Sequence, residues 1–203
     1  GRELKSRPVP GVDKKRTAYH EAGHALVTAL LPELDPLPKV SIIPRGRAMG
    51  STMMLPKNDE FMMSRDKILS IITSLMAGRA AELLFLGNVS TGAQNDIEKV
   101  TELARRMVCE WGMSETVGPI NFQSSASIPG FEEFGKKRDY SDDTAKLIDE
   151  EVASIIKSCS KRCADIIQEQ REILVAIAEN LIEQETLTAE EVSDIIAEEA
   201  EKL

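Results

Sequence analysis

The H-E-x-x-H pentapeptide at residues 20–24 constrains this chain more than any other feature, because it contains both histidines of the 203 residues. On a helix, side chains four residues apart lie on the same face, so His20 and His24 could bind one metal ion. Glu21 could then act as a general base on a water at that ion without being a ligand. The alternative is two ordinary histidines on a helix, but the pentapeptide lies in a mostly apolar run. The pattern therefore predicts a zinc hydrolase, most often a metalloprotease.

A catalytic zinc site needs three protein ligands and one open position for water. A third histidine is excluded because the chain has no other histidine. A glutamate at the spacing of thermolysin-like enzymes is excluded as well, because residues 39–57 contain no acid. The third ligand is therefore expected to be a more distant carboxylate or a cysteine.

Two carboxylates are the main candidates for this third ligand. Glu82 lies in an apolar helical segment, where a buried charge is costly without a partner, and that partner is either Arg79 or a metal. Asp96 lies in the early turns of another predicted helix, where an acid also stabilises the helix dipole. Composition does not decide between them. Weaker candidates, all in polar loops, are Glu33, Asp35 and Asp59.

The charge and the cysteine content exclude other classes of protein. A net charge of −9 argues against nucleic acid as a partner, because proteins that bind nucleic acid present a basic face. Three cysteines give no disulfide framework and fit a reducing compartment. Cys159 and Cys163 share a helix face, but no histidine remains to complete a second metal site. We expect them to be small buried hydrophobic residues.

Periodicity, capping and turn signals predict a mainly α fold, with a small antiparallel β-sheet and a long C-terminal helical region. Helices are expected over about 13–31, 65–86, 91–111 and 141–185 (the last with up to one break), with a final helix after a capping box at Thr188 and Glu191. Strands are expected at 39–44 and 48–55, paired with each other, and residues 112–140 are expected to be irregular. Gly23 either leaves space beside the metal or permits close helix packing.

Five strings, in order along the chain, match one family of proteins. They are TAYHEAGHA at 17–25, VSIIPRG at 40–46, GRAAE at 78–82, STGAQNDI at 90–97 and WGMS at 111–114. On these strings the chain resembles the protease domain of the FtsH-type membrane-anchored AAA+ zinc proteases. Several separate strings are far more specific than H-E-x-x-H alone.

The resemblance implies a role for each candidate residue. His20, His24 and Asp96 would be the zinc ligands, Glu21 the general base, and Glu82 an acid that supports the ligands or the fold. It also implies a linker at 1–12 from a missing ATPase module and a zinc metalloprotease domain at 13–203. Within that domain the catalytic part is about 13–125 and the helical part about 141–203.

The resemblance further implies Zn²⁺ as the cofactor, with ATP used only by the missing ATPase module. Expected partners are a homohexamer, the ATPase module in the same chain, and unfolded, damaged or membrane proteins as substrates. The membrane would be reached only through missing transmembrane segments, at the cytoplasmic face of the bacterial inner membrane. The predicted strand at 48–55 would bind extended substrate along its edge. Two other functions remain open: a zinc-stabilised assembly module, which would not need Glu21, and a hydrolase of small molecules.

Overall fold

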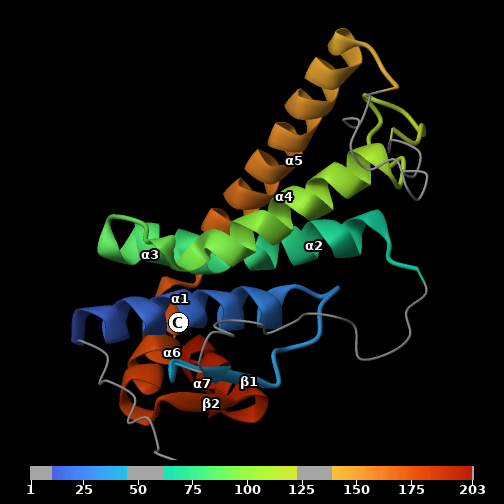
Figure 1. The fold of residues 1–203 in the computed structure, drawn as a ribbon. Helices are drawn as coiled ribbons and strands as arrows, with labels where there is room; N and C mark the ends of the chain where they lie inside the picture. The colour runs from blue at the N-terminus through green and yellow to red at the C-terminus, as the bar shows by residue number, and fades with distance from the viewer. Residues whose placement is uncertain (1–10, 45–61, 123–138, 203) are drawn as a thin grey trace, which may run out of the picture.

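Seven α-helices, one 3-10 helix and two short strands form the part of the chain that the structure describes, which is residues 11–44, 62–122 and 139–202 of the computed structural model (Figure 1). In chain order they are α1 (Gly11–Leu30), β1 (Lys39–Ser41), α2 (Arg65–Leu75), α3 (Ala77–Leu86), η1 (Thr91–Ala93), α4 (Gln94–Cys109), α5 (Asp142–Glu169), α6 (Arg171–Gln184), β2 (Thr186–Thr188) and α7 (Ala189–Ala200). This arrangement confirms the predicted fold class, mainly α with a small antiparallel sheet.

Helix α1 lies between the α2–α3 pair on one side and α6, α7 and the strands on the other (Figure 1). Its most extensive contacts are with α3 and α6. Ala18 and Ala22 are completely buried, and such small side chains let neighbouring helices approach closely. The helix includes Gly11, so its predicted start was two residues late. Residues 1–10 of the expected linker lie outside the described residues.

The helix predicted over 65–86 is divided at Met76 into α2 and α3. Its start is as predicted, since the Ser64 side chain caps α2 by accepting from the Lys67 backbone N–H at 3.2 Å. The break follows Ser74, whose carbonyl oxygen accepts a hydrogen bond from His24. A side chain that enters the backbone hydrogen-bond ladder is a recognised cause of helix kinks. The sequence pattern does not reveal this contact because the two residues are 50 positions apart.

The stretch Arg65–Leu86 is the one stretch of the described residues that is long and apolar enough to cross a membrane, and an 18-residue window within it has a mean hydropathy of 1.6. In the fold, 61% of that window is buried, and the two helices of the stretch pack against α1, α4 and α5. Core helices of soluble proteins share this composition, so the stretch is only weak evidence for a membrane span.

The helix predicted over 91–111 starts as η1 and continues as α4 from Gln94 to Cys109. Ser90 caps η1 by accepting from the Gly92 backbone N–H at 3.2 Å. The short 3-10 helix leads directly into α4, and Asp96 lies in the first turn of α4.

The C-terminal region has the predicted long helix with one break. Ser141 caps α5, and Gln170 separates α5 from α6. Thr188 and Glu191 form the predicted capping box at the start of α7, with both reciprocal hydrogen bonds present.

The two-stranded sheet pairs β1 with β2, in antiparallel register with Val40 opposite Leu187. The partner predicted for β1, residues 48–55, lies outside the described residues. Strand β2 was not predicted, because three residues between a helix and a capping box leave no alternating pattern. It follows Glu185, which ends α6 with a φ of 64° and lets the chain turn back toward β1.

Cys159 and Cys163 are buried on α5 and carry free thiols, in line with the prediction of small hydrophobic residues. Burial raises the pKa of the Cys163 thiol to about 12. A thiol that stays protonated at neutral pH is a poor metal ligand, which leaves the histidine cluster as the place to look for chemistry.

Candidate metal centre

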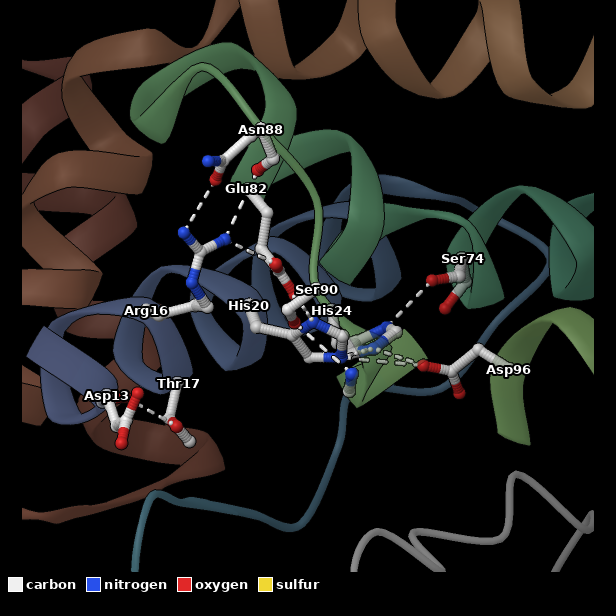
Figure 2. Close-up of polar contacts among 11 residues, drawn as sticks. Asp13, Arg16, Thr17, His20, His24, Ser74, Glu82, Asn88, Ser90 and Asp96 are labelled. Carbon is white, nitrogen blue, oxygen red and sulfur yellow. Dashed lines mark hydrogen bonds and ion pairs between the residues drawn. The ribbon is translucent and has the colours of Figure 1, made fainter. Parts of the chain in front are cut away.

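His20 and His24 lie one turn apart on α1 and turn their rings toward the same point (Figure 2). Their Nε2 atoms are 3.2 Å apart. His20 is buried and His24 is partly buried, so the pair lies at the edge of the core and not on an open helix face. This spacing follows from the helical repeat, as the sequence predicted.

Asp96 reaches the same point from α4 (Figure 2). Its Oδ2 atom is 3.2 Å from Nε2 of His24 and 3.4 Å from Nε2 of His20. The three candidate ligand atoms all lie within 4.8 Å of one another, in the only such group of histidine, cysteine and acidic side chains among the described residues. The structure thus brings together the three side chains for which the resemblance implied a metal-binding role.

The hydrogen bond made by Nδ1 of each imidazole determines whether Nε2, which faces the cluster, carries a proton in the neutral ring. His20 Nδ1 lies 2.7 Å from a Glu82 carboxylate oxygen, and His24 Nδ1 lies 2.9 Å from the Ser74 carbonyl oxygen. Both oxygens are acceptors, so both Nδ1 atoms carry the proton and donate it. In the neutral form of each ring, Nε2 then presents a lone pair to the cluster, next to the Asp96 carboxylate. Three acceptor atoms facing one another fit a bound cation, and two imidazoles with one carboxylate fit zinc.

The local charges also favour a cation at this point. Burial alone would lower the pKa of His20, but hydrogen bonds to Asp96 and Glu82 outweigh it and raise the pKa to about 9. Burial would raise the pKa of Asp96, yet its hydrogen bonds with His20 and His24 hold it well below its usual range. The carboxylate is therefore ionised at neutral pH, and the site attracts either a proton or a metal ion.

Glu82 lies outside the group of candidate ligands, although composition alone made it an equal candidate. It is 1% exposed, and its two oxygens accept from His20, from Ser90 at 3.1 Å and from Arg16 at 2.8 Å. Burial opposes its ionisation, but these hydrogen bonds lower its pKa to about 2. The partner suggested by the sequence, Arg79, is replaced by Arg16 of α1. Glu82 therefore orients the His20 ring through its Nδ1 atom, on the side of the ring away from the candidate ligand atoms.

The remaining acidic candidates lie elsewhere. Glu33 accepts a hydrogen bond from Ser70 at 2.9 Å, and neither Glu33 nor Asp35 belongs to the cluster. Asp59 lies outside the described residues. Glu21, the expected general base, is partly exposed and lies close enough to His20 for its charge to raise the pKa of that ring.

Two glycines let α3 approach the histidines. A Cβ atom on Gly78 would lie 2.5 Å from Cε1 and 2.6 Å from Cδ2 of His20, and also against Nε2. Real Cβ atoms do not come that close, so the imidazole occupies space that only glycine leaves open. A Cβ on Gly23 would lie 2.5 Å from the Ala77 carbonyl oxygen and 2.9 Å from the Ala81 Cβ atom. Of the two interpretations of Gly23, the contacts support close helix packing.

Sequence reasoning missed four residues that support the site, namely Arg16, Ser74, Gly78 and Ser90. Gly78 and Ser90 lie in the strings that carry the family resemblance, and this was the only signal that pointed to them. Their functions depend on contacts across the fold that no local pattern encodes.

Comparison with known proteins also points to a zinc protease. The sequence model of peptidase family M41 matches residues 8–195. The ATP-dependent zinc metalloprotease FtsH 3 of Symbiobacterium thermophilum is 45% identical over 197 residues, which cover 97% of this chain and 32% of that protein. FtsH of Thermotoga maritima is 42% identical over 205 residues, covering 100% of this chain and 34% of that protein. FtsH of Myxococcus xanthus is 45% identical over 197 residues, covering 97% and 31%.

The chain spans about a third of the length of these relatives. Their names agree with the expectation of a zinc protease, and the match over nearly the whole chain confirms the resemblance to an FtsH-type protease domain. The chain belongs to peptidase family M41.

Proposed function

We propose that this chain is a zinc-dependent endopeptidase and forms the proteolytic part of an ATP-dependent, membrane-anchored protease. One observation carries the proposal: Nε2 of His20, Nε2 of His24 and Oδ2 of Asp96 lie within 3.4 Å of one another. Family membership and the zinc metalloprotease names of the relatives support it.

His20, His24 and Asp96 would hold the zinc, and three protein ligands leave one position open for chemistry. When bound, zinc lowers the pKa of water toward neutrality and polarises a carbonyl group. Glu21 takes the proton from the attacking water and later gives it to the leaving amine of the cleaved peptide bond. One carboxylate thus serves as base and then as acid, and the sequence places it next to the first ligand.

Glu82 and Ser74 complete this site from outside. Their hydrogen bonds to the two Nδ1 atoms keep each imidazole in the tautomer that presents Nε2 to the zinc. The hydrogen bond to the Glu82 carboxylate also raises the basicity of His20.

The longer protein would supply what this chain does not. We propose an ATPase module in the same polypeptide, a homohexamer, and transmembrane segments that anchor it at the cytoplasmic face of the bacterial inner membrane. Its substrates would be unfolded, damaged or membrane proteins. Within this proposal, residues 1–12 link the ATPase module to the zinc metalloprotease domain at 13–203.

Removal of zinc should abolish cleavage of an unfolded substrate by this chain. A casein-type substrate is incubated with the untreated chain, with the chain after treatment by a chelator, and with the treated chain after addition of Zn²⁺ or, as a control, Mg²⁺. We expect activity to be lost on chelation and restored by Zn²⁺ alone, because Mg²⁺ prefers six oxygen ligands. A tightly folded substrate should remain intact with or without ATP.

Activity that survives chelation would contradict the zinc mechanism. Digestion of a tightly folded protein without ATP would contradict the proposed dependence on an ATPase. Zinc binding without cleavage of any peptide, even with the ATPase restored, would favour the alternative of a zinc-stabilised assembly module.

A further inference from the structure

A chain of hydrogen bonds connects Arg16, near the start of α1, with the ring of His20 through Glu82 (Figure 2). Arg16 Nη1 lies 2.8 Å from one Glu82 oxygen, and His20 Nδ1 lies 2.7 Å from the other. Arg16 precedes His20 by four residues, so both side chains reach the same carboxylate from one face of α1. The side chain of Glu82 is 1% exposed and that of Arg16 is 24% exposed. Water therefore replaces this guanidinium poorly if it is removed.

The same guanidinium also holds the turn that follows α3. Arg16 Nη2 donates to Asn88 Oδ1 at 2.6 Å, and Nη1 donates to the Asn88 carbonyl oxygen at 3.2 Å. Asn88 follows Gly87, which ends α3 with a φ of 75°. Arginine presents its donors in a rigid planar fork, so these bonds fix the position of the turn relative to α1.

Ser90 extends the network toward the third ligand. Its hydroxyl donates to the Glu82 oxygen that also accepts from His20. The same hydroxyl accepts from Gly92 as the cap of η1, and η1 leads directly into α4, which carries Asp96. The network therefore contacts the helix that bears the two histidines and the start of the segment that bears Asp96.

We propose that Arg16 is a positioning residue of the metal centre, an inference that rests on the proposed zinc function. By pairing with Glu82, it keeps that carboxylate in place to orient the His20 ring. By holding Asn88, it fixes the point from which the chain runs to Asp96. Arg16 itself touches neither the metal nor the substrate, and it acts through the geometry of the ligands.

The test compares zinc affinity, measured by competition with a chromophoric chelator, in the wild type, Arg16→Gln, Arg16→Lys and Lys14→Gln. Lys14 is the matched control: it lies on the same helix, its loss removes the same charge, and its ion pair with Glu185, 3.4 Å long, is at the surface. Arg16→Gln should weaken zinc binding roughly tenfold or more, the usual effect of losing a group that supports a ligand. Arg16→Lys should lose less zinc affinity than Arg16→Gln, because lysine keeps the positive charge but not the planar fork of donors. Lys14→Gln should bind zinc as tightly as the wild type.

A second comparison shows whether Arg16 acts through Glu82. In a Glu82→Gln background zinc binding is already weakened. Adding Arg16→Gln should then weaken it by much less than in the wild type, because only the contact of Arg16 with Asn88 remains to be lost. The visible absorption of the Co²⁺-substituted protein should also change in Arg16→Gln, which reports altered ligand geometry independently of activity.

Zinc affinity of Arg16→Gln within about twofold of the wild type would overturn the proposal. So would an equally large loss in the Glu82→Gln background. If Arg16→Gln does not fold, Arg16→Lys carries the test, and wild-type affinity and cobalt absorption in that variant would overturn the proposal. A wild type that binds zinc but cleaves no peptide would contradict the proposed function and leave the comparison of affinities valid.

Discussion

Glu21→Gln should keep its zinc and lose nearly all of its peptidase activity, by roughly a hundredfold to ten-thousandfold. Glutamine has almost the shape of glutamate but does not accept a proton from water at neutral pH. The three candidate ligands are His20, His24 and Asp96, so the substitution leaves the metal site intact. The loss should appear mainly in kcat, because proton transfer belongs to the chemical step.

Asp13→Asn is the matched control for this substitution. Asp13 lies in the first turn of the same helix and is exposed, and the change also converts one carboxylate into an amide. Its activity should equal that of the wild type. Zinc content and peptidase activity are measured on the same samples. A Glu21→Gln variant that retains more than about a tenth of wild-type activity would assign the general base to another group.

Gly78→Ala should remove the metal while leaving the fold largely intact. The added methyl group would lie 2.5 Å from Cε1 of His20, a distance that forces the ring to move. The ring is the end of a rotatable side chain, so it turns away at lower cost than the helices would separate. With His20 displaced, two ligands remain. Zinc affinity should therefore fall by about a hundredfold or more, which exceeds the usual effect of losing a residue that only hydrogen-bonds a ligand.

The control for this change is Gly11→Ala, another helical glycine, whose added methyl would meet nothing within 4 Å. It should bind zinc like the wild type. Zinc titration is combined with circular dichroism and a thermal melt to separate loss of the ligand from loss of the fold. Wild-type zinc affinity in a folded Gly78→Ala variant would show that the ring is not confined by α3.

Local sequence signals predicted much of this protein. The helical repeat placed His20 and His24 on one face, and the caps at Ser64, Ser141 and Thr188 marked where helices begin. Each of these features is encoded within a few residues, so a pattern in one short segment is sufficient to find it.

What the sequence did not reveal depends on contacts between distant segments. Arg16 and Glu82 are 66 positions apart, and the partners in the β1–β2 pair are about 145 apart. The choice between Glu82 and Asp96 as third ligand also required the fold, or the family resemblance in its place. Each side chain lies on a helix as expected, but only the packing of α3 against α1 and of α4 against α2 shows which carboxylate faces the Nε2 atoms.

The most direct test of the account is a crystal structure of the zinc-loaded chain with an anomalous difference map at the zinc absorption edge. We expect one peak bound by Nε2 of His20, Nε2 of His24 and an Asp96 oxygen, at about 2.0–2.2 Å, with the fourth position open to solvent. Glu82 should remain on the Nδ1 side of His20. A peak bound by Glu82 in place of Asp96, or closed by a fourth protein ligand, would contradict the proposed catalytic centre.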